Sequence, residues 1–122
     1  MARIIVVDDS GYARRVHRRI LENGGHDVLE AASGIAALEA FYLEKPDVIL
    51  LDLSMEDMSG LEVLAQLRQL DRQVRVVVVS ADVQRSTEAM VRAAGALRFI
   101  GKPAAPEVLL RAIDEILDEV PQ

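Results

Sequence analysis

Short apolar segments alternate five times with amphipathic segments, and this alternation restricts the fold more than any other feature of the chain. The apolar segments, which we interpret as strands, are residues 3–7, 26–31, 47–51, 74–79 and 97–100. The amphipathic segments, which we interpret as helices, are residues 11–23, 35–44, 60–70, 82–94 and 106–120. This pattern predicts an α/β fold of the (βα)5 type, a doubly wound five-stranded parallel sheet with helices on both faces and right-handed crossovers.

Residues that begin and end helices agree with these boundaries. Ser10 and Ser33 are placed to cap the first two predicted helices. Gly24-Gly25 and Gly95 are placed to end the first and the fourth. Pro106 suits the first turn of the last helix, where its missing N–H has no cost.

Length, composition and charge limit the classes of function. With 122 residues and no repeat or linker, the chain suits one domain, residues 1–122. The absence of cysteine excludes disulfides, thiolate nucleophiles and cysteine metal sites. A formal net charge of −6 argues against nucleic acid as the main partner, because phosphate backbones are bound by basic surfaces. No apolar run is long enough to span a membrane and no signal peptide precedes the first strand, so we expect a cytoplasmic protein without a membrane partner.

Chemically useful residues follow four of the five predicted strands. Asp8 and Asp9 come after the first strand, and Asp52 follows the third directly. Ser80 follows the fourth strand, and Lys102 comes shortly after the fifth. Ligands of open α/β sheets bind at the carboxyl edge, so we expect these side chains to meet there. Each also has an ordinary alternative: Asp8 and Asp9 as loop carboxylates, Asp52 as a turn residue, Ser80 as a helix cap and Lys102 as a turn lysine.

The expected cluster combines three carboxylates with one ammonium group. Two carboxylates about 4 Å apart repel by about 4 kcal/mol at an effective dielectric constant near 20, so three of them need a cation or raised pKa values. Carboxylate oxygens without His or Cys favour Mg²⁺, which keeps several waters and binds phosphate oxygens. Lys102 is one of only two lysines among 14 basic residues, and a lysine supplies a compact point charge. These residues predict a phosphoryl site with Asp52 as nucleophile.

Four segments carry these residues in a characteristic order and spacing: VVDDS (6–10), LLDLSMEDMSGLEVL (50–64), VVVVSA (76–81) and GALRFIGKP (95–103). Together they resemble the receiver domain of two-component response regulators, and the resemblance spans essentially the whole chain. It implies a flavodoxin-like, CheY-like sheet with strand order 2-1-3-4-5. It also implies a signalling domain rather than an enzyme, although one that assists its own phosphorylation and autodephosphorylation.

The resemblance implies a role for each site residue. Asp52 accepts a phosphoryl group from a phosphohistidine on a sensor histidine kinase or a histidine phosphotransfer protein. Lys102 and the Ser80 hydroxyl bind phosphoryl oxygens. Mg²⁺ is the expected cofactor, held by Asp8, Asp9, Asp52 and the backbone carbonyl of Ser54.

Further positions relate to switching or depart from the family pattern. Phe99 matches an aromatic switch position whose ring turns inward when Ser80 moves toward the phosphoryl group, with plain core packing as the alternative. The Lys102–Pro103 bond is expected to be cis. Glu56 stands where the family usually has proline, so the loop that follows the phosphoacceptor is expected to be less rigid. Asp82 either influences the attacking water or simply starts the fourth helix.

The output partner is unknown from the sequence. We expect no output domain after Val120, and we therefore expect signalling through phosphorylation-dependent contacts with another protein. One alternative is a small Mg²⁺ phosphohydrolase of the haloacid-dehalogenase type, which normally places a second Asp where this chain has Ser54 and carries a cap domain. Another alternative is a pseudo-receiver that acts as a scaffold.

The first predicted helix carries four arginines opposite an apolar stripe. We expect Ala13, Val16 and Ile20 to face the core. The arginines either form a solvated face or provide a docking surface for an acidic phosphodonor, and they are Arg14, Arg15, Arg18 and Arg19.

Overall fold

The computed structural model describes residues 2–119, in which strands and helices alternate as predicted. The strands are β1 (Arg3–Val7), β2 (Asp27–Ala31), β3 (Val48–Asp52), β4 (Val76–Ser80) and β5 (Arg98–Gly101). The helices are α1 (Gly11–Asn23), α2 (Gly34–Glu44), α3 (Gly60–Leu70), α4 (Arg85–Ala93) and α5 (Pro106–Asp118). Val120, the last residue of the predicted fifth helix, lies outside the described residues.

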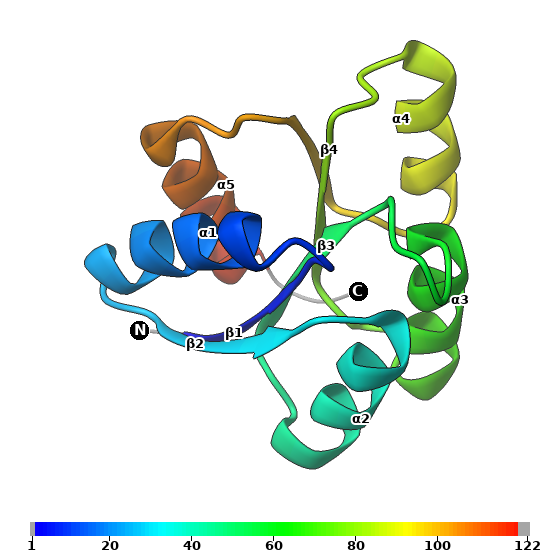
Figure 1. Cartoon of the computed structure of the whole chain (residues 1–122), viewed down its shortest axis with the longest axis horizontal. Coiled ribbons are helices and arrows are strands. Elements are labelled where there is room, and N and C mark those ends of the chain that lie inside the picture. The colour runs from blue at the N-terminus through cyan, green and yellow to red at the C-terminus, as the bar shows by residue number, and fades with distance from the viewer. Residues whose placement is uncertain (1, 120–122) are drawn as a thin grey trace.

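The strands form one parallel sheet in the order β2-β1-β3-β4-β5, which confirms the predicted fold class. Val7 of β1 lies beside Leu51 of β3, and Asp52 lies beside Val79 of β4. Helices α1 and α5 cover one face of the sheet, and α2, α3 and α4 cover the other (Figure 1). The strand order reverses between β1 and β3, so the carboxyl ends of these two strands frame the crevice in which such sheets bind ligands.

Strands β3 and β4 are buried along their whole length, which explains their unbroken apolar sequences. Successive side chains point to opposite faces, and both faces are covered by helices. Each fully buried aliphatic side chain contributes about 1.5–3 kcal/mol relative to an exposed one. The buried strands β3 and β4 therefore fix the positions of the polar residues at their ends, Asp52 and Ser80.

Two elements begin two or three residues later than predicted because local turns intervene. β4 begins at Val76 rather than at residue 74, since the Val74 N–H donates to a carbonyl in the preceding turn. α4 begins at Arg85 rather than at residue 82. Asp82 instead accepts a hydrogen bond from the backbone N–H of Gln84 at 3.1 Å, and this turn leads into the helix.

Helix α1 buries only part of the predicted stripe, since Ile20 packs partly buried against the core. Val16, which we expected in the core, is 38% exposed, whereas His17 is 5% exposed and Leu21 is fully buried. A histidine within the buried stripe obscured the helical periodicity of the apolar residues. Burial lowers the pKa of His17, so its imidazole remains neutral at physiological pH. Within residues 2–119, no helix combines the length and the hydropathy that crossing a bilayer requires.

Candidate functional site

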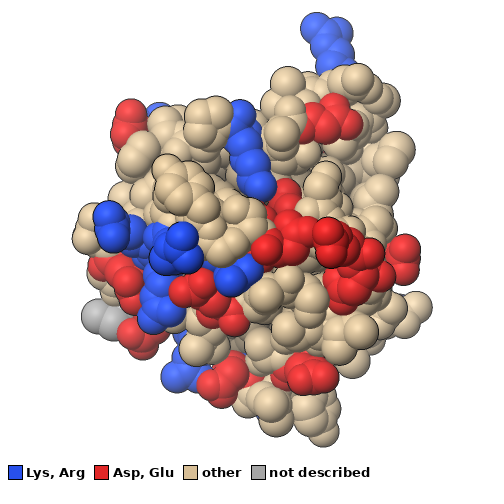
Figure 2. All heavy atoms as spheres, viewed as in Figure 1, with Lys and Arg blue, Asp and Glu red and all other residues tan. Residues whose placement is uncertain are grey.

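The structure brings the five residues singled out by sequence to one edge of the sheet. Asp8 and Asp9 directly follow β1, Asp52 ends β3, Ser80 ends β4, and Lys102 follows β5. Acidic atoms gather in the middle of this face of the molecule, where β1 and β3 end, with basic atoms beside them over α1 (Figure 2). The parallel sheet explains this convergence, because all its strands end at the same edge.

Three carboxylates at this edge offer a metal site. One oxygen from each of Asp8, Asp9 and Asp52 lies within 4.8 Å of the others. Asp8 and Asp52 are 2% and 6% exposed, whereas Asp9 is exposed to solvent. Hard carboxylate oxygens at such spacing suit a divalent cation that keeps part of its water shell, as Mg²⁺ does.

Lys102 joins two of the acids. Its Nζ donates to Asp8 Oδ2 at 2.9 Å and to Asp52 Oδ1 at 3.0 Å. Burial acts to lower the pKa of Lys102, but the hydrogen bonds to the two carboxylates outweigh it, so the pKa is raised and the ammonium stays charged. For Asp52, burial dominates and raises the pKa; the charge of Asp8 adds to this effect, while Lys102 opposes it. This geometry disfavours the alternative of Lys102 as an ordinary turn lysine.

Asp8 is fixed by its surroundings. Its Oδ1 accepts a hydrogen bond from the backbone N–H of Ser10 at 2.9 Å, and its own N–H donates to Ala31 of β2 at 3.1 Å. Arg14 donates through Nη1 to the Asp8 carbonyl at 2.6 Å and through Nε to Glu30 at 3.0 Å. This arginine therefore supports the acidic segment instead of belonging to a solvated face.

Ser80 occupies the β4 side of the site. Its Oγ accepts a hydrogen bond from the Asp82 N–H at 3.0 Å, and its backbone carbonyl accepts one from the Lys102 N–H at 2.9 Å. The serine is not the cap of α4, because that helix begins at Arg85 after the N-cap residue Gln84. Since the oxygen of the Ser80 hydroxyl is used as an acceptor, its proton can be donated toward the site.

Asp82 lies in the turn that leads into α4 and is bound to the first turn of that helix. Beyond its contact with Gln84, its Oδ2 accepts a hydrogen bond from the Thr87 hydroxyl at 2.7 Å. These bonds, led by that of Thr87, lower the pKa of Asp82. The contacts give Asp82 a structural role in the turn before α4, although the helix itself begins three residues later.

Two positions implied by the resemblance lie at strand β5. Phe99 is partly buried against the core on the α2–α4 side, which is compatible with both a switch residue and plain core packing. The Lys102–Pro103 peptide bond is cis.

Comparison with known proteins identifies the family. The family model described as "Response regulator receiver domain" matches residues 4–114. The chain belongs to the response regulator receiver family of two-component systems. It is 35% identical to the "Chemotaxis protein CheY" of Bacillus subtilis, a match that covers 95% of this chain and 98% of that protein. It is 30% identical to the "Sporulation initiation phosphotransferase F" of the same species, covering 97% and 90% of the two chains.

A solved receiver has the same fold. The crystal structure of a CheY-like response regulator receiver domain from Methanospirillum hungatei superposes with a TM-score of 0.91 at 30% identity, over 97% of this chain and 94% of that one. Since the family match covers most of the chain, it favours a receiver over the haloacid-dehalogenase alternative. The acids that converge with Lys102 also weigh against a scaffold without phosphoryl chemistry.

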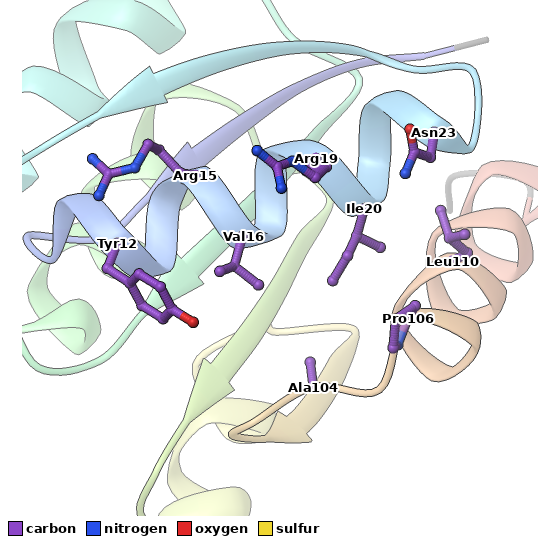
Figure 3. Close-up of a pocket in the computed structure, with 9 residues that line it drawn as sticks. All are labelled: Tyr12, Arg15, Val16, Arg19, Ile20, Asn23, Ala104, Pro106 and Leu110. Carbon is purple, nitrogen blue, oxygen red and sulfur yellow. The ribbon is translucent and has the colours of Figure 1, made fainter.

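The receiver has a groove between α1 and the start of α5, with a volume of about 480 Å³. Figure 3 shows apolar side chains of α1 directed toward residues of the β5–α5 connection and α5, while two arginines lie along the same helix. The apolar residues include Tyr12, Val16, Ile20, Ala104 and Leu110, and the arginines are Arg15 and Arg19. Val16 is thus exposed because it lines a groove.

The four arginines of α1 divide into two pairs with different surroundings. Arg14 and Arg18 form ion pairs with Glu30 of β2 at 3.0 and 2.9 Å. Arg15 and Arg19 border the groove and form no ion pair with any residue in the range 2–119. Helical spacing hinted at this division, since residues four apart share a side of the helix.

Proposed function

We propose that Asp52 of this receiver accepts a phosphoryl group from a phosphohistidine, in a reaction that needs Mg²⁺. The contact that supports this proposal most strongly is the pair of hydrogen bonds from Lys102 Nζ to Asp8 and Asp52. A mobile ammonium beside a buried carboxylate can bind the incoming phosphoryl oxygens. Asp8, Asp9 and Asp52 would hold the metal, together with the backbone carbonyl of Ser54.

The proposed transfer requires little of the protein beyond positioning and charge. A carboxylate oxygen of Asp52 attacks phosphorus; an O–P bond forms and the P–N bond to the donor imidazole breaks, leaving its electron pair on nitrogen. Mg²⁺, when bound, would neutralise charge on the transferred group. Lys102 would move its hydrogen bond from Asp52 to a phosphoryl oxygen while it keeps the bond to Asp8.

Phosphorylation would then change the face formed by α4, β5 and α5. The phosphoryl group adds nearly two negative charges and several acceptor oxygens. Ser80 would turn its hydroxyl toward them and give up its contact with the Asp82 N–H, and Phe99 would move inward. A partner protein that binds one arrangement of this face more tightly would carry the signal. In this proposal residues 1–122 act as one receiver domain that signals through another protein and assists its own phosphorylation and dephosphorylation.

Incubation with acetyl phosphate and Mg²⁺ tests this function. We expect mass spectrometry to find one phosphoryl group per chain, on the peptide that contains Asp52, and expect EDTA to prevent labelling. Sustained hydrolysis of p-nitrophenyl phosphate without a stable phosphorylated form would instead support a phosphohydrolase. A chain that stays unlabelled with Mg²⁺ present would contradict the proposal.

The groove beside α1 is the proposed contact for the phosphodonor. Its apolar residues fit the side of a helical bundle, and the charges of Arg15 and Arg19 suit acidic residues on that partner. The related sporulation protein is named a phosphotransferase, which agrees with transfer of a phosphoryl group.

Charge reversal tests this contact. We expect Arg15→Glu and Arg19→Glu each to slow transfer from the partner kinase or phosphotransfer protein by about tenfold, because steering and close charge pairs are lost. Labelling by acetyl phosphate should not change, since that small donor does not need the groove. Arg72→Glu, at an exposed position away from the groove, is the matched control. Equal slowing with both donors would place the defect in the site instead of the groove.

A further inference from the structure

The loop between β3 and α3, residues 53–59, directly follows the phosphoacceptor and is closed at its base. The Gly60 N–H donates to the Leu53 carbonyl at 2.9 Å. A Cβ at Gly60 would lie 2.6 Å from Leu53 Cα and 2.8 Å from the carbonyl oxygen of Asp52. Only glycine permits this approach, so the two ends of the loop are fixed against each other.

The far side of the loop is bound to a helix that is distant in sequence. Asp57 Oδ1 accepts a hydrogen bond from the Gly34 N–H at 3.0 Å, and Oδ2 accepts one from the Ile35 N–H at 3.1 Å. Both donors belong to the first turn of α2, whose N–H groups lack partners within the helix. The hydrogen bonds to Gly34 and Ile35 lower the pKa of Asp57, so the carboxylate is charged at neutral pH.

Packing strengthens the same contact. A Cβ at Gly34 would lie 2.9 Å from Met58 Sδ, which means that the Met58 side chain rests on the backbone where α2 begins. Ser33 caps the next N–H of the helix, that of Ala36, at 3.1 Å, so it does not compete with Asp57. The loop is therefore held at its base by Gly60 and at its tip by Asp57 and Met58.

These contacts restrain a loop whose central residue is Glu56. A proline would limit the backbone freedom of the loop in the unliganded state, and Glu56 does not. We propose that Asp57 restrains the loop by binding the N-terminus of α2, and that it thereby positions the Ser54 carbonyl for Mg²⁺. Asp57 is a positioning residue, and the inference rests on the function proposed above.

The test compares loop exchange and Mg²⁺ affinity in three variants. Asp57→Ala removes both hydrogen bonds to α2. Glu56→Gln removes one negative charge from the same loop and leaves those bonds in place, so it controls for long-range attraction of the cation. Glu56→Pro combined with Asp57→Ala restores a backbone restraint without the carboxylate. Amide hydrogen exchange without metal reports the restraint, and calorimetric titration with Mg²⁺ reports its consequence.

We expect Asp57→Ala to speed exchange of the loop amides and of Gly34 and Ile35, and to weaken Mg²⁺ binding by about tenfold, the effect usual for groups that orient metal ligands. Glu56→Gln should change affinity by less than about twofold. Adding Glu56→Pro should recover much of the lost affinity.

The measurements distinguish failure of the positioning role of Asp57 from failure of the proposed function. Faster exchange in Asp57→Ala with wild-type Mg²⁺ affinity would overturn the positioning role and leave the proposed function intact. An equal loss of affinity in Glu56→Gln would also overturn it, because charge alone would then explain the effect. If the wild-type chain binds no Mg²⁺, the proposed function itself fails. If Asp57→Ala does not fold, Asp57→Asn replaces it in the test, because asparagine keeps one acceptor oxygen. We expect Asp57→Asn to change amide exchange and Mg²⁺ affinity in the same directions but by smaller amounts.

Discussion

Asp52→Asn is expected to abolish labelling by acetyl phosphate and, without Mg²⁺, to make the domain more stable at neutral pH. The amide cannot serve as the phosphoryl acceptor, so the loss of labelling should be complete. Lys102 keeps its bond to Asp8 in the variant, and the asparagine oxygen can still accept from it. The variant should therefore fold normally.

The stability gain follows from the raised pKa of Asp52. Burial, together with the charge of Asp8, raises this pKa, so the carboxylate is less favourable in the folded state than in the unfolded one. The stability that Asp52 provides is complete below its unfolded pKa and is lost as the pH rises through the folded pKa. Asparagine is neutral throughout, so the difference between variant and wild type should be small below about pH 4 and larger at pH 7.

Thermal unfolding in EDTA at several pH values measures this difference. We expect a rise of a few degrees at pH 7, since about 1 kcal/mol corresponds to roughly 4 °C in a domain of this size. Asp114→Asn, at an exposed position on α5, is the control for net charge. Undiminished labelling of Asp52→Asn would show that another residue accepts the phosphoryl group. A variant less stable than wild type at pH 7 would show that the bond to Lys102 outweighs burial.

Asp9→Asn is expected to remove most of the Mg²⁺ response. Asp9 is exposed, whereas Asp8 and Asp52 are buried and bound to Lys102. Replacement of Asp9 should therefore leave the fold unchanged. It offers one of the three carboxylates within 4.8 Å of each other, and a divalent ion gains most of its affinity from such charged ligands.

Thermal unfolding with increasing Mg²⁺ measures the effect. A ligand at 100 times its Kd stabilises the folded state by about 2.7 kcal/mol, so the wild-type Tm should rise by roughly 10 °C. We expect the variant to need at least about tenfold more Mg²⁺ for the same rise. Acetyl phosphate labelling should decline in parallel. The metal site would lie elsewhere if Asp9→Asn and wild type responded equally, with Asp114→Asn again as control.

Local patterns determined the elements and the edge at which the site lies. Unbroken apolar runs such as 48–51 are buried strands, and Ser10 and Ser33 cap the helices predicted for them. Because parallel strands all end at one edge, the positions of Asp8, Asp52 and Lys102 just after strands were enough to predict that they meet. The strand order came from the resemblance to receivers, since alternation alone is compatible with several orders.

Contacts between distant segments were decided only by the tertiary structure. Sequence placed Val16 in the core and left Arg14 either on a solvated face or on a docking surface. The angle at which α1 lies on the sheet exposes Val16 and pairs Arg14 with Glu30. The bond between Asp57 and the start of α2 joins residues 23 positions apart. Periodicity indicates which face of an element is apolar; it does not state which partner a polar side chain meets. The partner of a polar side chain depends on how the packed elements are oriented, because a hydrogen bond tolerates only a few tenths of an ångström in donor–acceptor distance and a narrow range of angles.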